Sequence, residues 1–432
     1  MRRMMILTVL AIVLTAGAGL TGEMTPEALL PVHEEQDAYT PCVAFARDVY
    51  VVAWQSGRLA PGDLREGFNF NASIVGCRVD KTGKALDARP FPIAGAASLG
   101  KLPGTVNLRQ KPHAAANGDI VLVVWQDLRN GKDWDVYAAR VAPDGKVLDP
   151  DGILVCGGPH NQAMPQVAWD GKTFLVVWQD YRSNDHYDIY AGRVGADGKA
   201  LDPQGFLVSA GQKGVNKIAP AVASAGDGKS YLFFPELKDW QGMDFFAWHH
   251  GVMVADGKVG QATVFDGSRR EFHEPPQKQT WPDRRATPLA MAAGGRSYLL
   301  TWHNWLPFSR GHFPAGNVAI FDETGSKRTK ALALGNFIAP EVCWDGSAFV
   351  LAWSQAQEEP RRGRYNAAHV VRISPEGEVV MADQFVSGTF ASPAYETAVA
   401  SDGAGTTLIA YEKHPEKGDV PIRIGFRMLT AK

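Results

Sequence analysis

The sequence has 432 residues, of which 45% are hydrophobic and 21% are charged, and its formal net charge at pH 7 is −2. This composition is that of a folded globular chain, and the small net charge argues against nucleic acid or an anionic membrane as a partner. The length allows two or three domains, or a single β-fold with many strands. The 45 glycines and 27 prolines favour many short strands, because each strand needs a turn at its end.

The N-terminal segment, residues 1–22, is typical of a secretory signal peptide. Arg2 and Arg3 are basic, residues 4–14 are almost entirely apolar, and residues 16–18 read Ala-Gly-Ala, the pattern of a cleavage site. The apolar run is short for a membrane anchor. We therefore predict a secreted or periplasmic protein with no membrane attachment after cleavage.

A long internal repeat follows. Residues 112–155 and 165–208 align at an offset of 53 residues without a gap, and 24 of the 44 positions are identical. Weaker copies cover the rest of the chain. The aromatic residue that ends the second strand of each copy recurs at Trp54, Trp125, Trp178, Phe234, Trp302, Trp353 and Tyr411.

Each copy is predicted to contain four strands. Asp-Gly pairs such as Asp170-Gly171 and Asp144-Gly145 separate short apolar runs, and this pair is typical of two-residue hairpin turns. No stretch after the first 22 residues has sustained helical periodicity. Four-strand units at a period near 50 residues are typical of β-propeller blades.

We therefore predict an all-β chain that forms one β-propeller over residues 29–432. Seven blades are most consistent with the copies, although six or eight are alternatives. The last copy ends after its third strand, so residues 29–33 are expected to add the missing outer strand and close the ring. The predicted blades span 38–96, 110–157, 163–210, 218–266, 286–335, 338–388, and 394–432 with 29–33.

The second and third copies resemble the TolB-type, or WD40-like, propeller repeat. The resemblance rests on Asp127-x-Arg129, then Asp135-Val136-Tyr137, then Asp144-Gly145, and on the same pattern 53 residues later. It implies a propeller, and it implies no particular activity, because this repeat type occurs in binding proteins and in enzymes. Recurring charged residues such as Asp127 and Arg129 are expected to form ion pairs that stabilise the blade corners.

The four cysteines, Cys42, Cys77, Cys156 and Cys343, lie in apolar runs and not in CxxC pairs, so we expect small buried residues and no metal site. A disulfide between Cys42 and Cys77 stays open as an alternative. No motif for a cofactor, a nucleophilic serine or a phosphate-binding loop is present.

The two faces of the predicted ring differ. One face carries the short Asp-Gly turns, and the other carries long connections between second and third strands and between blades. Long loops on a rigid scaffold commonly carry function, so we predict the site on the long-loop face near blades four to six. The binding residues predicted there are Trp240, His273, Trp281, Arg284, Trp305 and Arg361.

Residues near the starts of the inner strands are expected to line the mouth of the central channel. These are His113, Gln166, Glu341 and Glu396.

Two functions from different classes remain open. The first is a module that binds a glycan or a protein partner, because aromatic rings stack on sugars and arginines contact anionic groups. The alternative is a carbohydrate-active enzyme, either a glycosidase with two carboxylates or a polysaccharide lyase. The catalytic candidates for a lyase are His303, Arg310, His312 and Tyr365.

Overall fold

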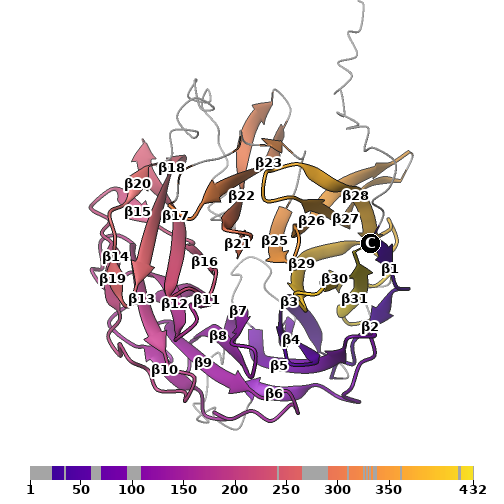
Figure 1. Cartoon of the computed structure of the whole chain (residues 1–432), viewed down its shortest axis with the longest axis horizontal. Helices are drawn as coiled ribbons and strands as arrows, with labels where there is room; N and C mark the ends of the chain where they lie inside the picture. Colours follow the sequence, from indigo (N-terminus) through magenta and orange to yellow (C-terminus); the bar gives the residue numbers. More distant parts are fainter. Residues whose placement is uncertain are drawn as a thin grey trace, which may run out of the picture.

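The structure is a computed structural model. It describes residues 22–33, 36–59, 70–94, 109–240, 243–264, 290–308, 311–324, 326, 329, 332–333, 338–360, 362–416 and 420–431. Within these ranges all regular secondary structure is β-strand, and seven sheets surround a central opening (Figure 1). The prediction of a seven-bladed β-propeller is therefore confirmed.

Each sheet is one blade, and its first strand lies nearest the centre. Blades one to three are β3–β6 (Asp37–Ala46, Val49–Leu59, Phe70–Asp80, Phe91–Ala94), β7–β10 (Arg109–Ala116, Val121–Asp127, Asp135–Val141, Ile153–Cys156) and β11–β14 (Gln162–Trp169, Phe174–Asp180, Asp188–Val194, Phe206–Ser209).

Blade four is β15–β20, with an inner strand split into β15 (Val215–Lys217) and β16 (Ala221–Ser224), followed by β17 (Lys229–Trp240), β18 (Met243–Ala255), β19 (Lys258–Val259) and β20 (Thr263–Val264). Blade five is β21–β24 (Ala290–Gly294, Ser297–Phe308, Gly311–Asp322, Leu332–Ala333), and blade six is β25–β28 (Ile338–Trp344, Phe349–Glu359, Gly363–Ile373, Val379–Ser387). Blade seven has β29–β31 (Ala394–Ser401, Thr406–Lys413, Arg423–Thr430).

The ring closes through the N-terminal segment. Strands β1 (Glu23–Met24) and β2 (Ala28–Leu29) both pair antiparallel with β31, so they supply the outer strand of blade seven. The predicted closure is confirmed, but the paired segment begins earlier than residue 29. Glu27 reinforces the closure by accepting hydrogen bonds from the hydroxyls of Tyr411, at 2.6 Å, and Ser387.

The hydrophobic core lies between neighbouring blades. Alternate residues of a strand point to opposite faces of its sheet, so Val121 and Val123 of β8 pack towards blade one, and Leu122 and Val124 pack towards blade three. All four cysteines are free, and three of them are buried, as expected for small apolar residues; Cys343 is half-buried.

The corner ion pairs predicted from the repeat are present. Asp127 is fully buried, and its Oδ2 atom accepts hydrogen bonds from the indole N–H of Trp125 at 2.8 Å and from the guanidinium of Arg129 at 2.6 Å. The Arg129 guanidinium lies 3.8 Å from the ring centre of Tyr137. Asp180, Trp178 and Arg182 repeat this arrangement in blade three, so these charges stabilise the scaffold.

The Asp-Gly turns also join one blade to the next. Gly171 in the inner turn of blade three has φ +96°, and a Cβ atom there would lie 2.2 Å from the carbonyl oxygen of Gly226 in blade four. On the outer turn, Gly198 packs against the guanidinium of Arg140 from blade two, which itself pairs with Asp149 at 2.8 Å. These turns therefore require glycine for space as well as for backbone conformation.

The opposite face corrects one prediction. The connections expected to be long irregular loops in blades four, five and six are continuous β-hairpins, because β17–β18, β22–β23 and β26–β27 remain paired almost to their tips. Loss of the repeat motif hid the strand pattern, although the backbone pairing continues. We call this side of the ring the hairpin face.

Candidate functional site

The inner strands share an unusual backbone feature where they start, on the hairpin face. Residues before or at the start of the strand core have left-handed φ angles in six blades, namely Thr40 (45°), Lys111 (54°), Met164 (56°), Ala219 (43°), Ala339 (46°) and Glu396 (35°). In five of these blades proline follows, and in blade seven Thr397 does. The strand pairing shifts register at this point in five of these blades, which is a β-bulge, and in blade four the inner strand is interrupted there between β15 and β16.

The preceding blade holds this bulge in place. The backbone N–H of Met164 donates to the side-chain oxygen of Gln126 at 3.0 Å, and the N–H of Ala219 donates to that of Gln179 at 3.0 Å. The N–H of Thr40 donates to the Glu412 carboxylate at 2.7 Å, which links blade seven to blade one. The bulge is therefore a shared scaffold element, while its side chain is free to differ from blade to blade.

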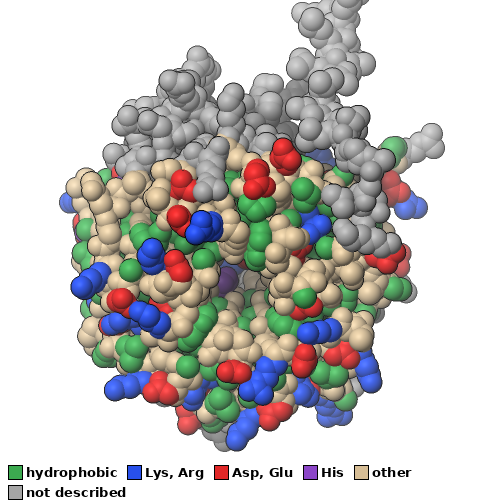
Figure 2. Space-filling view, in the orientation of Figure 1, with side chains coloured by type: hydrophobic (Ala, Val, Ile, Leu, Met, Phe, Trp, Pro, Cys, Tyr) green, Lys and Arg blue, Asp and Glu red, His purple; other side chains and the backbone are tan. Residues whose placement is uncertain are grey.

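The bulges and the residues just after them surround the space at the centre of the ring, which we call the axial opening. Figure 2 shows this hollow, with a histidine side chain visible in it. The bulge side chains differ sharply around it, since blades four and six contribute alanine, while blades seven, one and two contribute Glu396, Thr40 and Lys111. Polar side chains are thus concentrated on one part of the rim.

Two carboxyl groups from neighbouring blades lie at this opening. Glu341 follows the bulge of blade six, and Glu396 is the bulge residue of blade seven; both side chains keep partial solvent contact. Burial raises the pKa of Glu341 from 4.5 to about 8, and the negative charge of Glu396 adds to this effect. Glu341 therefore holds its proton at pH 7.

His113 follows the bulge of blade two and faces blade three. Its Nδ1 atom accepts a hydrogen bond from the backbone N–H of Val167 at 3.3 Å. Burial lowers the pKa of His113 from 6.5 to about 4, so the ring is neutral at pH 7 and carries its proton on Nε2. This histidine is a hydrogen-bond donor at neutral pH and not a proton acceptor.

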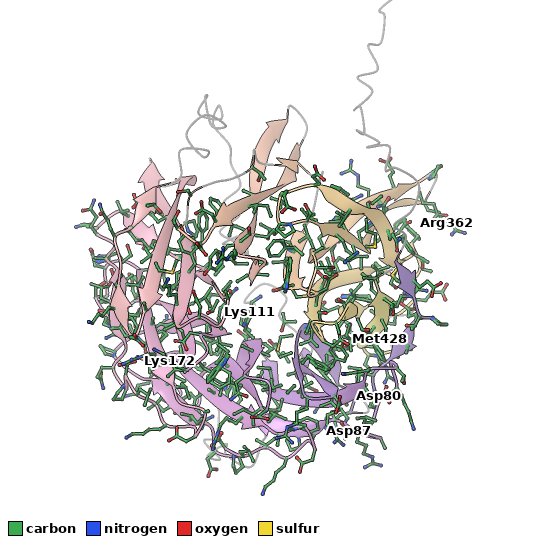
Figure 3. The ribbon with its side chains drawn as sticks, viewed as in Figure 1. Asp80, Asp87, Lys111, Lys172, Arg362 and Met428 are labelled. Atoms are coloured by element: carbon green, nitrogen blue, oxygen red, sulfur yellow. The ribbon has the colours of Figure 1, made fainter. Side chains whose placement is uncertain are left out.

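Lys111 lies beside His113 on the rim. Figure 3 places it at the central opening, next to the start of β7. Its side chain is exposed, and within the described part of the chain no carboxylate lies within 4.0 Å of its ammonium group. It contributes a positive charge two blades away from Glu396.

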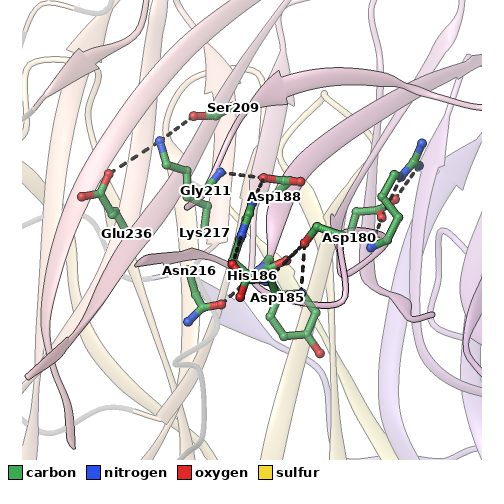
Figure 4. Close-up of polar contacts among 12 residues, drawn as sticks. Asp180, Asp185, His186, Asp188, Ser209, Gly211, Asn216, Lys217 and Glu236 are labelled. Atoms are coloured by element: carbon green, nitrogen blue, oxygen red, sulfur yellow. Dashed lines mark hydrogen bonds and ion pairs between the residues drawn. The ribbon is translucent and has the colours of Figure 1, made fainter. Parts of the chain in front are cut away.

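A further charged cluster occupies the corner of blade four, on the same face. The Lys217 ammonium lies 3.6 Å from the Glu236 carboxylate and donates to Ser209 at 2.8 Å (Figure 4). Nε2 of His250 lies 3.0 Å from Glu236. Glu236 stands two residues after Phe234, as Asp127 stands two residues after Trp125. The cluster is therefore the blade-four version of the corner ion pairs and has a structural role.

The sequence-predicted site residues fall into three groups. His113 and Glu341 lie at the axial opening, and Tyr365 lies half-buried on β27. His273, Trp281, Arg284, Arg310 and Arg361 lie outside the described residues. The backbone places the others on the extended hairpins, in the pairs Trp240 with Met243, His303 with Gly316, Trp305 with Pro314 and His312 with Pro307.

Sequence reasoning missed Lys111. Its signal was available, because it precedes a proline at the same blade position as Thr40, Met164 and Ala339. The aligned repeat of residues 112–155 begins after Lys111 and so left it out, and the bulge that brings this position to the opening is visible only in the backbone.

The described residues include no helix long and apolar enough to cross a membrane. They also contain no group of three or more histidine, cysteine or acidic side chains arranged to hold a metal ion.

No family model and no curated protein matches the sequence. Among solved structures, the polysaccharide lyase Uly1 aligns with a TM-score of 0.52 and 10% identity, over 91% of this chain and 90% of the lyase. A protein of unknown function from Dyadobacter fermentans aligns with a TM-score of 0.49 and 12% identity, over 95% and 99% of the two chains. A xylan β-1,4-xylosidase from Bacillus halodurans aligns at 0.38 and 11%, over 93% and 97%.

At these identities the likeness to the lyase is one of fold. The propeller implied by the TolB-type resemblance is confirmed, whereas no family model assigns the chain to the TolB type.

Proposed function

We propose that the protein is an extracytoplasmic carbohydrate-active enzyme that hydrolyses a glycosidic bond at the axial opening. The observation that carries the proposal is the pair Glu341 and Glu396 on adjacent blades, in which burial and the negative charge of Glu396 raise the pKa of Glu341 to about 8. Two carboxyl groups with different protonation states are what glycoside hydrolysis needs.

In the proposed reaction, Glu341 donates its proton to the glycosidic oxygen as the bond between that oxygen and the anomeric carbon breaks. Water adds to the anomeric carbon, and the Glu396 carboxylate takes the proton that the water releases. The two carboxyl groups then return to their starting states by exchanging a proton with solvent. The extended hairpins that carry Trp305, His312 and Tyr365 would form the outer part of the glycan-binding surface.

Hydrolysis fits this opening better than elimination by a lyase. Elimination needs a base that removes a ring proton, and His113 is the histidine that the described part of the chain places at the opening. Its Nδ1 lone pair is occupied by the Val167 N–H, and its pKa is lowered to about 4 by burial. A histidine in this state is a poor proton acceptor.

The acid pair also distinguishes an enzyme from a module that only binds a glycan or a protein. Binding alone does not require a carboxyl group that stays protonated near pH 7, whereas a general acid does. Perturbed acidic groups that converge on an opening are therefore an argument for catalysis.

The test is a panel of polysaccharides, including xylan, arabinan and polygalacturonate, incubated with the purified protein. New reducing ends report hydrolysis, and the ultraviolet absorbance of unsaturated sugars reports elimination. We expect reducing ends only, with Glu341→Gln lowering kcat by about 10²-fold or more and leaving binding intact. Activity should fall as the pH rises through about 8, because Glu341 then loses its proton.

Glu376→Gln is the matched control, since Glu376 is exposed at the turn before β28, on the face with the Asp-Gly turns. Glycan binding without any cleavage would reject the enzyme and leave the binding module. Unsaturated products would reject hydrolysis in favour of a lyase.

A further inference from the structure

The axial opening carries a positively charged side chain, that of Lys111, in addition to Glu341 and Glu396. The proposed hydrolysis by the two carboxyl groups does not use this lysine. Lys111 is the bulge residue of blade two, at the position occupied by Thr40, Met164 and Ala339 in other blades. An alanine fits this backbone position in blades four and six, so the fold does not require lysine there. The bulge itself therefore does not account for the charge of Lys111.

The surroundings of Lys111 leave its ammonium available to a ligand. The side chain is exposed and has no ion-pair partner within the described part of the chain. The adjacent titratable side chain, His113, is neutral at pH 7, so it neither repels nor neutralises the lysine. The nearest carboxyl groups identified at the opening belong to blades six and seven, on the other side of blade one.

The bulge also restricts where the charge can lie. The left-handed φ of 54° and the following Pro112 fix the direction in which the Lys111 side chain leaves the backbone, and Figure 3 places this residue at the central opening. A lysine held at a rim is suited to an anionic group, because its ammonium donates charge-assisted hydrogen bonds.

We propose that Lys111 recognises an anionic substituent, a carboxylate or a sulfate, on a sugar bound at the axial opening. The substrate class is then an acidic glycan, with its charged group directed towards blade two and its scissile bond towards blades six and seven. This inference rests on the proposed function for the position of the scissile bond, but the anion-binding step stands without it.

The experiment measures binding to three polysaccharides at pH 7 by calorimetry or affinity electrophoresis. The probes are polygalacturonate, which carries carboxylates, a sulfated galactan, and neutral xylan as the uncharged reference. Lys111→Gln should weaken binding to one anionic probe by roughly tenfold and leave xylan binding unchanged. Lys111→Arg should retain most of the affinity, since it keeps the charge.

Lys146→Gln is the matched control, because Lys146 is an exposed lysine of the same blade on the opposite face. The proposal would be overturned if wild type and Lys111→Gln bound the anionic probes equally. It would also be overturned if Lys111→Gln and Lys146→Gln lost the same affinity. The preferred anionic probe separates a carboxylate from a sulfate. Binding that depends on Lys111 without any cleavage would reject the hydrolase and support the anion site. Cleavage that does not depend on Lys111 would support the hydrolase and reject the anion site.

Discussion

Replacing Glu341 with glutamine should change how stability depends on pH, in a direction fixed by the pKa of this carboxyl group. In the folded protein burial, aided by the charge of Glu396, raises the pKa of Glu341 from 4.5 to about 8. Between these pH values the folded chain keeps a proton that the unfolded chain has released. The free energy of unfolding of the wild type therefore falls as the pH rises across this window.

The linkage gives the size of the effect. A difference between pKa 4.5 and about 8 corresponds to an upper limit of about 5 kcal/mol. Solvent contact of the side chain in the opening reduces this, so we expect roughly 2 kcal/mol. Glutamine has nearly the same shape and no charge, so Glu341→Gln should be more stable than wild type by that amount at pH 9 and equal to it at pH 4.

Urea unfolding followed by tryptophan fluorescence at pH 4, 6, 8 and 9 measures the difference. Glu396→Gln should lower the pKa of Glu341 and so produce a smaller change, because it removes only the charge contribution. Glu376→Gln, at an exposed turn, should follow the wild-type curve. Parallel curves for wild type and Glu341→Gln would refute the reasoning, since they would mean that Glu341 titrates alike in the folded and unfolded chains.

Three further predictions concern the scaffold. Gly171→Ala should lower the free energy of unfolding by roughly 3 kcal/mol or more, because its Cβ would lie 2.2 Å from a carbonyl oxygen. Gly118 has a similar φ of +95° but open space around it, so Gly118→Ala should lower the free energy of unfolding by only about 1 kcal/mol in the same urea assay. His113→Gln should remove an acid-induced loss of stability of up to about 3 kcal/mol between pH 6.5 and 4, because folded His113 stays neutral while the unfolded chain binds a proton; identical acid profiles would contradict this. Glu27→Gln should destabilise the ring closure by about 1 kcal/mol at pH 7 and less at pH 3. Burial raises the pKa of Glu27, but hydrogen bonds from Ser387 and Tyr411 and the charge of Lys413 outweigh burial and hold the pKa below 4.5. An equal loss of stability at both pH values would contradict the role of the Glu27 carboxylate in ring closure.

The ring was predictable from the sequence because neighbouring blades repeat the same side-chain contacts at the same positions. Trp125 and Asp127 recur as Trp178 and Asp180, since in both blades the carboxylate accepts a hydrogen bond from the buried indole N–H at the same position. The closing strand was predictable because blade seven lacked an outer strand, although its start at Glu23 was not, since a two-residue strand carries no periodic signal.

The hairpins and the opening were less accessible to sequence reasoning. The pairing of β22 with β23 continues past Trp305, where the repeat motif has ended, because backbone hydrogen bonds do not require a particular side chain. The left-handed bulge at Lys111 was harder to predict, since the recurring residue before proline marks the position but does not reveal its φ angle. Both features depend on backbone geometry, which side-chain patterns report only indirectly.

The bulge also yields a role for His303 that differs from its candidacy as a catalytic base. His303 directly follows Trp302, as Gln126 follows Trp125 and Gln179 follows Trp178. Gln126, Gln179 and Glu412 each accept the bulge N–H of the next blade. By this equivalence His303 should accept the N–H of Ala339, in the blade that carries Glu341.

Two variants separate this role from catalysis. His303→Gln restores the residue found in blades two and three, so it should keep both the urea midpoint and glycan cleavage near wild type. His303→Ala should lower the free energy of unfolding by about 1 kcal/mol, because a buried N–H loses its acceptor. A base would show the opposite pattern, with both variants stable and both inactive. Near-wild-type cleavage by His303→Gln, together with the lower stability of His303→Ala, would therefore exclude His303 as the base and support its positioning role.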